Sequence, residues 1–261
     1  MHAVFSEFRT AFPLIWNGDP YLVQIISFTL QVAAVATSIA AVIGIPIGLV
    51  LGLGRFRGRQ VLRVLANASL GLPPALVGAG LFLLFAVPAP LGSLQLLSTR
   101  RVVFVAQTIL ALPYTVALTA AAVEGLPDGL LVQARTLGAG RAQIAILAIR
   151  EARVGMVAAI IAALGTSLSE VAAIAILGGN IYGYNQTLAS ATLYEVNAAN
   201  YPMALAIAIV LLGMILILMG SVALLQVPTQ MTLLWIGIAI AVLAFPLFLV
   251  LSRLGFNSSE H

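Results

Sequence analysis

The sequence contains no cysteine and no lysine, and its only histidines are His2 and His261, at the two ends. Without cysteine the chain cannot form disulfides, thiolate metal sites or thiol nucleophiles. Without lysine it cannot contain the P-loop of a Walker-type ATPase, which requires that residue. No histidine is available to an interior catalytic or metal site. The sequence therefore predicts a chain that is not an enzyme and that holds no cofactor or metal ion of its own.

Charged residues are also scarce: they make up 8% of the 261 residues, whereas 62% of the residues are hydrophobic. A soluble domain contains about 25% charged residues, so this chain has too little polar surface to cover itself in water. Its apolar runs are long and lack the alternation of membrane β-strands. The sequence therefore predicts an all-α integral membrane protein in contact with the lipid bilayer. The net charge of +4 gives no indication of nucleic-acid binding, because the arginines follow the membrane topology described below.

Six apolar runs approach or exceed the length of about 20 residues that a helix needs to cross a bilayer. Five are expected to form the core of a polytopic helix bundle, and the sixth adds a C-terminal span. The runs cover residues 22–51, 72–89, 102–123, 154–177, 202–225 and 231–252. Residues 61–70 are expected to form a separate helix near the membrane surface. The chain then divides into an N-terminal interfacial segment (1–20), a transmembrane domain (21–226) and an additional apolar helix with its tail (227–261).

The arginines give this bundle an orientation. Two loops, after the first and third runs, lie on the same side and contain eight of the twelve arginines: Arg55, Arg57, Arg59, Arg63, Arg135, Arg141, Arg150 and Arg153. Basic loops remain cytoplasmic, so the loop 124–153 is expected in the cytoplasm and the N-terminus outside. The polar loop 178–201 then faces outward. Arg100 and Arg101 also fall on the external side and are exceptions to the rule.

Within the basic loop, residues 133–153 read QARTLGAGRAQIAILAIREAR, a polar segment with a glycine-containing turn. Gly138 and Gly140 can adopt positive φ there. Two short helices joined at this turn would project into a groove on a soluble partner. Ile144 and Leu147 would fill a hydrophobic slot on that partner, and flanking arginines would pair with acidic rims. The alternative is an ordinary basic loop that only orients membrane insertion.

The segment ARTLGAGRAQ, residues 134–143, resembles the Glu-Ala-Ala…Gly loop with which permeases of ABC transporters bind their ATPase subunit. Gly138 matches the glycine of that loop. The sequence departs from the family at Val132 and Gln133, which replace the glutamate and the first alanine, and at Glu151, where many permeases have proline. The resemblance implies an ATPase-coupling role for Arg135, Thr136, Leu137, Gly138, Ala139, Gly140, Arg141, Ile144 and Leu147.

The resemblance extends over most of the chain. Residues 67–78 (NASLGLPPALVG) and 106–113 (AQTILALP) look like segments of oxyanion permeases. Residues 168–173 (LSEVAA) and 177–181 (LGGNI) resemble the Gly-Glu-Phe-Gly-Ala…Gly-Gly-Asn-Ile pattern of sulfate and molybdate permeases. The serine before the glutamate and the Leu-Pro-Pro segment are most similar to tungstate-type permeases.

That family has the fold of a type I ABC importer permease. Membership implies a prokaryotic inner-membrane subunit that conducts an oxyanion, with tungstate first and molybdate or sulfate next. The ATPase would be a separate cytoplasmic subunit dimer, and an extracytoplasmic oxyanion-binding protein would deliver the cargo. Five or six helices are few for enclosing a path, so a homodimer with the path on its two-fold axis is expected.

Glu170 is the one carboxylate well inside a predicted span, and such residues are functional candidates because a buried charge is costly. An anionic cargo should avoid a carboxylate, which favours a structural role in which Glu170 bonds across helices. A place on the path is the alternative. Thr166, Ser167 and Ser169 lie within one helical turn of Glu170. They either line a polar path or gate, or they are small residues that let helices pack closely.

Two other functions are compatible with a helical membrane protein. A secondary transporter usually has internal repeats and several intramembrane charges, and neither is clear here. A membrane scaffold without transport function would leave the glycine-containing loop and Glu170 without a purpose.

Overall fold

The computed structural model describes residues 2–127 and 129–225, and every regular element in these residues is helical. The all-α prediction is therefore confirmed for this part of the chain. In chain order the helices are α1 (His2–Trp16), α2 (Pro20–Leu53), α3 (Arg59–Ser69), α4 (Pro74–Phe85), a 3-10 turn η1 (Gly92–Leu94), α5 (Arg100–Glu124), α6 (Leu130–Thr136), α7 (Arg141–Glu151), α8 (Arg153–Ser169), α9 (Ala172–Gly178), α10 (Leu188–Asn197) and α11 (Tyr201–Leu225). The sixth apolar run, 231–252, and the segment 227–261 lie outside the described residues.

Three of these helices, α2, α5 and α11, are long and apolar enough to cross a membrane alone. Two more spans result if each bent helix pair is counted as one: α3–α4, bent by 103°, and α8–α9, bent by 58°. Five core spans were expected from the sequence, but the second of them, 72–89, did not include α3, and only Pro74–Phe85 of that run forms a helix, α4. One expectation needs correction, because the run 154–177 is not a single helix but is interrupted after Ser169.

The bend between α3 and α4 follows from the local sequence. α3 confirms the separate helix expected over residues 61–70, and Gly71 and two prolines follow it. A proline has no backbone N–H and cannot continue a helix, but it fits the first turn of a new one. Pro73 is accordingly extended, with φ −60° and ψ 124°, and Pro74 begins α4.

α2 and α5 form the central pair and run parallel, because matched contacts advance by four residues on both helices. A Cβ added at Gly48 would lie 2.7 Å from the backbone oxygen of Val116 and 2.7 Å from Thr119 Cβ, which is closer than real Cβ atoms come. Glycines four residues apart share one face of a helix and let two backbones approach closely. The three close contacts are Gly44–Thr115, Gly48–Thr119 and Gly52–Val123.

α8 packs against both helices of this pair, again through small residues. Ala40 of α2, Ala111 of α5 and Ala163 of α8 are each 0% exposed and form one buried cluster. Gly155, near the start of α8, is so close to α5 that an added Cβ would lie 2.5 Å from Ala122 Cβ. The three helices therefore form a tightly packed unit.

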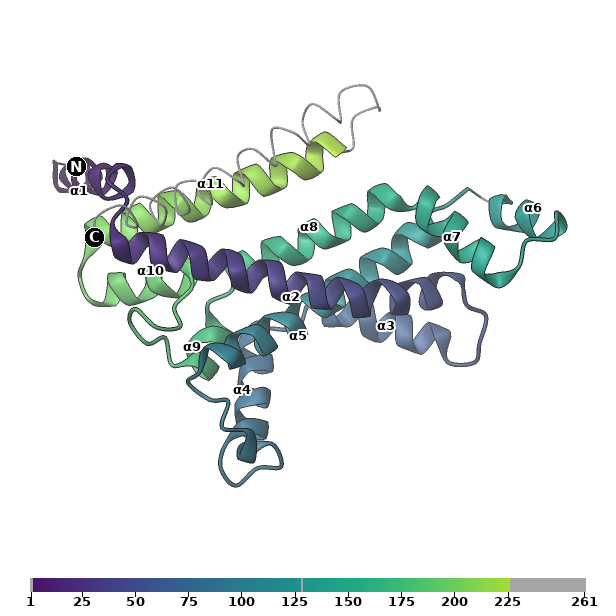
Figure 1. The fold of residues 1–261 in the computed structure, drawn as a ribbon, viewed down its shortest axis with the longest axis horizontal. Helices are drawn as coiled ribbons and strands as arrows, with labels where there is room; N and C mark the ends of the chain where they lie inside the picture. The colour runs from purple at the N-terminus through teal and green to yellow at the C-terminus, as the bar shows by residue number, and fades with distance from the viewer. Residues whose placement is uncertain (1, 128, 226–261) are drawn as a thin grey trace, which may run out of the picture.

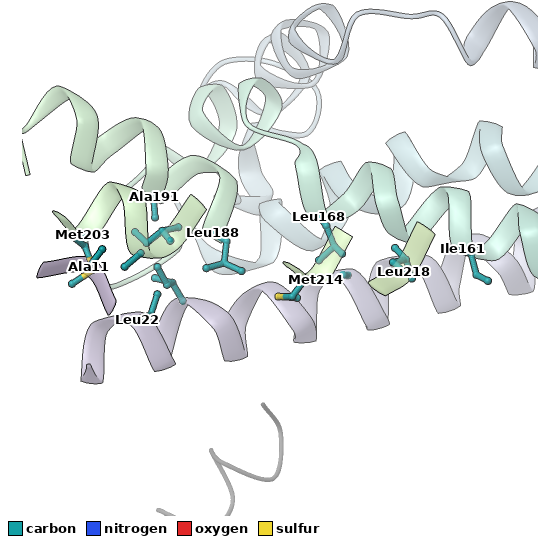
Figure 2. Packing of buried hydrophobic residues seen from close by; sticks show 13 residues of the cluster. Ala11, Leu22, Ile161, Leu168, Leu188, Ala191, Met203, Met214 and Leu218 are labelled. Atoms are coloured by element: carbon teal, nitrogen blue, oxygen red, sulfur yellow. The ribbon is translucent and has the colours of Figure 1, made fainter. Parts of the chain in front are cut away.

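α1, α10 and α11 surround the beginning of α2 and one face of α8. Figure 2 shows the buried side chains that join them, including Leu22, Leu188 and Met203. α10 was not expected, because the sequence 178–201 reads as a polar loop. Its start is marked by a capping box in which Ser190 N donates to Thr187 Oγ1 at 3.4 Å and Thr187 N donates to Ser190 Oγ at 3.0 Å.

The glycine contacts lead to a prediction for Gly48. Gly48→Ala should lower the midpoint of thermal unfolding in detergent, because overpacking costs about 1–3 kcal/mol. Gly213→Ala is the matched control: an added Cβ there meets nothing within 4 Å, and the gain in helix propensity is the same. Equal midpoints for the two variants would contradict the close packing of α2 on α5.

Candidate functional site

The loop expected to contact a soluble partner forms α6 and α7, two short helices at the end of the molecule where α2 and α5 terminate (Figure 1). Gly138, between them, has φ 87°, so its expected positive φ is confirmed. Gly138 N donates to Arg135 O and Ala139 N donates to Ala134 O, both at 3.0 Å. This is the Schellman arrangement, which ends a helix and satisfies its last carbonyl groups. The turn is therefore a defined structure.

Gly140 differs from the expectation of positive φ. It has φ −73° and ψ 171°, and it precedes the first residue of α7. Gly140 N donates to Gln143 Oε1 at 2.8 Å, which closes the start of that helix. One glycine of the pair thus ends α6, while the other begins α7.

The turn is the most exposed part of this knob, which we define as residues 130–151. Leu137 is 88% exposed, and an added Cβ at Gly138 would meet nothing within 4 Å. Among the other predicted coupling residues, Arg135, Thr136, Gly140 and Arg141 are exposed, and Ala139 and Leu147 are half-buried. The knob therefore presents an apolar tip between arginines.

Ile144 does not lie on that exposed surface. It is only 5% exposed, so the expectation that it would face a partner is wrong for the isolated chain. Ile146 and Ile149 are exposed instead and were missed. Residues 144–149 (IAILAI) are all apolar, so the sequence does not show which of them face the protein. The side that packs against the protein is set by tertiary contacts.

Charged and polar groups tie the ends of α2, α3 and α5 together beside the knob. Arg59 Nη2 lies 2.5 Å from Glu124 Oε1 at the end of α5, and Arg63 pairs with the other carboxylate oxygen. Arg59 also donates from Nε to Leu51 O at 2.6 Å and from Nη2 to Gly52 O at 3.0 Å. Because these groups are partly exposed, each pair is worth at most about 1 kcal/mol. The network joins the ends of α2, α3 and α5.

Glu170 lies in the break between α8 and α9 and is 6% exposed. Its Oε1 accepts a hydrogen bond from Ala173 N at 2.8 Å, so it satisfies an amide at the start of α9. We expected a bond across helices, but the bond described is local. Because the Glu170 carboxylate accepts from a backbone amide at the start of α9, the helix can be interrupted within the apolar run without leaving that amide unpaired.

The three hydroxyl residues near Glu170 have different surroundings. Thr166 is half-buried and donates to Ala162 O at 3.1 Å, and the exposed Ser169 donates to Gly165 O at 3.0 Å. Ser167 is 2% exposed, and its hydroxyl has no hydrogen-bond partner among the described residues. Of the four candidates, Ser167 and Glu170 are therefore inside the protomer, and Ser169 is the most accessible.

Further polar side chains without a partner in the described residues lie on α2 and α5. Thr37 is 2% exposed and Gln107 is 0% exposed, and neither amide atom of Gln107 forms a hydrogen bond there. Ala40, Ala111 and Ala163 pack together about one helical turn away. Thr37, Gln107 and Ser167 therefore lie at a similar level of the three-helix unit, a polar layer that the sequence did not reveal.

At the opposite end, the loop between α9 and α10 is held by amide side chains. Asn185 Nδ2 donates to Gly178 O at 2.5 Å, and its Oδ1 accepts from Ile181 N at 2.8 Å. Tyr21 stacks on Tyr182 with ring centroids 4.4 Å apart. Burial and, next, the nearby Glu195 carboxylate raise the pKa of the Tyr182 phenol above its ordinary value. The Gly-Gly-Asn-Ile segment thus belongs to an ordered loop.

Arg100, one of the two exceptions in the arginine pattern, is part of the same end. Its Nε donates to Tyr184 O at 2.5 Å. Its guanidinium lies 5.0 Å from the ring centroid of Phe28 and 5.4 Å from that of Tyr184. These cation–π contacts give Arg100 a local structural role on this side of the protein.

Comparisons with known proteins cover most of the chain. Residues 44–227 match the family described as "Binding-protein-dependent transport system inner membrane component". A "Probable anion ABC transporter permease protein" of Haloferax volcanii is 35% identical over 201 residues, 75% of this chain and 87% of that protein. A "Tungstate uptake system permease protein TupB" of Peptoclostridium acidaminophilum is 31% identical over 212 residues, 81% of this chain and 93% of that protein.

A solved structure of the "MetNI methionine ABC transporter" in inward-facing conformations has a similar fold. Its TM-score is 0.62 at 19% sequence identity, and the match covers 81% of this chain and 95% of that chain. At this identity the likeness concerns the fold alone.

The position of Glu170 leads to a stability prediction. Glu170→Gln keeps an oxygen that can accept from Ala173 N and should change the unfolding midpoint little. Glu170→Ala leaves a buried amide unpaired and should destabilise the protein by about 1–3 kcal/mol. Thermal unfolding of both variants in the same detergent tests this. A glutamine variant as unstable as the alanine variant would show that the charge, and not the cap, matters.

Proposed function

The chain belongs to the family of binding-protein-dependent transport system inner membrane components, and on that premise we propose that it is the membrane-spanning permease of an ABC importer for an oxyanion. Tungstate is the first candidate cargo, followed by molybdate and sulfate. The names of two relatives, an anion permease and a tungstate uptake permease, support this order. Family membership also favours a permease over the secondary transporter and the scaffold considered from the sequence.

The observation that carries the proposal is the knob at the end of α2 and α5. A rigid helix–turn–helix with Leu137 88% exposed at its tip is suited to insert into a groove on a soluble protein. The chain lacks lysine and therefore a P-loop of its own. The partner in that groove is then a separate cytoplasmic ATPase subunit. The surface offered to it comprises Arg135, Thr136, Leu137, Gly138, Ala139, Gly140, Arg141 and Leu147, with Ile146 and Ile149 added from their exposure.

Two further partners belong to the proposal. A second copy of the chain would complete the path, because the described bundle has too few spans to enclose one. α4 supports this assembly: Leu76 and Leu83 are 61% and 71% exposed, which leaves an apolar face for a second copy or for lipid. An external oxyanion-binding protein would deliver the cargo at the end that contains the α9–α10 loop.

The proposed orientation places the knob in the cytoplasm of a prokaryotic cell and the N-terminus outside. The positive-inside rule supports it, since eight of the twelve arginines lie in the two loops on the knob side. The chain has no cysteine, so a single cysteine at position 141 reports the side of the membrane directly. Its modification in intact cells by a membrane-impermeant reagent would contradict this orientation.

The turn at Gly138 provides the test of function. Gly138→Val should leave the protein inserted in the membrane but abolish ATP-driven tungstate uptake. A β-branched residue at φ 87° is strained by about 1–2 kcal/mol and would distort the tip. Uptake of radiolabelled tungstate is measured in cells that lack the native permease and express the variant with its ATPase and binding protein.

Gly58→Val is the matched control. Gly58 also has φ 87° and nothing within 4 Å of an added Cβ, but it lies between α2 and α3, outside the knob. The same backbone strain there should leave uptake close to that of the unmodified protein. Normal uptake by the Gly138 variant, or equal loss in both variants, would count against coupling through the knob.

A further inference from the structure

A cavity of about 800 Å³ lies between the end of α2 and the two helices of the knob. Cavities that bind small ligands usually measure about 300–1,000 Å³, so its size is in the range of a binding site. Its walls are formed by Leu49, Val50, Leu53, Gly54, Arg55, Arg135, Ala139, Gly140, Arg141, Ile144 and Ala145. We call it the arginine pocket.

The charged residues that line the arginine pocket are all positive. It includes Arg55, Arg135 and Arg141 and no acidic residue. None of these arginines has an ion pair or side-chain hydrogen bond among the described residues, where the two ion pairs both involve Glu124. Three cations around one cavity repel each other. Such an arrangement is stabilised when an anion binds between them.

Glu124 does not neutralise this group. It lines an adjoining cavity of about 280 Å³ that also includes Arg55 and Arg135. Its two carboxylate oxygens, however, are already paired with Arg59 and Arg63. The positive charge of the arginine pocket is therefore left for an anion that is not part of the described chain.

The chemistry of the lining points to a tetrahedral oxyanion such as a phosphate group. Guanidinium groups bind phosphate through pairs of N–H donors in fixed geometry. Gly140 and Arg141 also bring the start of α7 to the pocket, whose first amide groups add positive potential. The helix start supplements the arginines and is not needed for the argument.

The apolar half of the lining indicates where such a group comes from. Leu49, Val50 and Leu53 belong to the last turns of α2, which is one of the membrane-spanning helices. Ile43, Ile47 and Val50 follow one another at helical spacing toward the pocket. Their side chains are 44%, 43% and 58% exposed, respectively. An acyl chain against this stripe would bring a phosphate headgroup to the arginines.

We propose that the arginine pocket binds a phosphate-type anion at the cytoplasmic membrane surface, with an anionic phospholipid headgroup as the favoured source and a free oxyanion as the other. Basic pockets at the cytoplasmic ends of transmembrane helices recognise such headgroups. A bound headgroup would link the end of α2 to the knob and hold the knob in register with the membrane-spanning pair. The proposal rests on the proposed orientation, which places the knob in the cytoplasm, and not on the ATPase contact, although Arg135 and Arg141 also belong to the surface proposed for that contact.

The test uses the full-length chain without its ATPase, reconstituted in nanodiscs. The cavity variant is Arg55→Gln, Arg135→Gln and Arg141→Gln combined. The charge-matched control is Arg57→Gln, Arg150→Gln and Arg153→Gln combined: these arginines are on the same side, are exposed and do not line the pocket. Non-specific attraction between arginines and anionic lipid is reduced equally in both variants. A difference between them therefore reports on the pocket.

In the lipid arm, nanodiscs of phosphatidylcholine alone are compared with nanodiscs that also contain phosphatidylglycerol. The anionic lipid should raise the unfolding midpoint of the unmodified chain and of the control, but not that of the cavity variant. Retention of phosphatidylglycerol in native mass spectrometry should be at least about tenfold weaker for the cavity variant, because charged hydrogen bonds are lost. In the free-anion arm, inorganic phosphate or sulfate is added to phosphatidylcholine nanodiscs.

Each result separates the possibilities. A lipid response confined to the unmodified chain and the control supports a headgroup site, and the same pattern in the free-anion arm alone supports a free oxyanion. Equal responses of both variants, or no response of the unmodified chain, overturn the proposal.

If the cavity variant does not fold, Arg55→Gln is compared with Arg57→Gln. These two arginines are separated by one residue, but only Arg55 lines the arginine pocket and neither belongs to the knob. The single change at Arg55 should then weaken phosphatidylglycerol retention, and the change at Arg57 should not. Equal retention by the two single variants would overturn the proposal.

Discussion

The close contact between α2 and α5 is the constraint on which the rest of the structure depends. Glycines every four residues on α2 remove the side chains that would otherwise separate the two backbones. At one end of the pair, Arg59 bonds both the last carbonyls of α2 and Glu124 at the end of α5. At the other end, Arg100 of α5 stacks on Phe28 of α2. The pair is thus closed at both ends and packed in the middle, and α8 packs against it.

The position of the knob follows from this pair. α6 and α7 come directly after α5 and directly before α8, so both ends of the knob are attached to the three-helix unit. Movement of a partner bound at the tip would therefore be transmitted to helices that are packed against each other without large side chains between them. The break at Glu170 gives the span after the knob a second segment, α9, that is oriented by 58° to the first.

The sequence revealed the helical class and the positive φ at Gly138, because long apolar runs and a glycine at the end of a short helix are local signals. It did not reveal the break in the run 154–177, since apolar residues continue on both sides of Glu170 and only a capping bond marks the interruption. α10 was missed because residues 178–201 read as a polar loop, although Thr187 and Ser190 form a recognisable cap. The burial of Ile144 and the pairing of Glu124 depend on contacts between distant segments, which periodicity does not contain.

We propose that the tip around Leu137 and Gly138 faces the cytoplasm and contacts a separate ATPase subunit. A photo-crosslinking side chain at position 137, where the residue is 88% exposed, tests it most directly in membranes that contain the complete transporter. We expect a crosslink to the ATPase subunit from position 137, and none from a crosslinker placed at position 182 at the opposite end. A crosslink to the external binding protein from position 137, or to the ATPase subunit only from position 182, would contradict it.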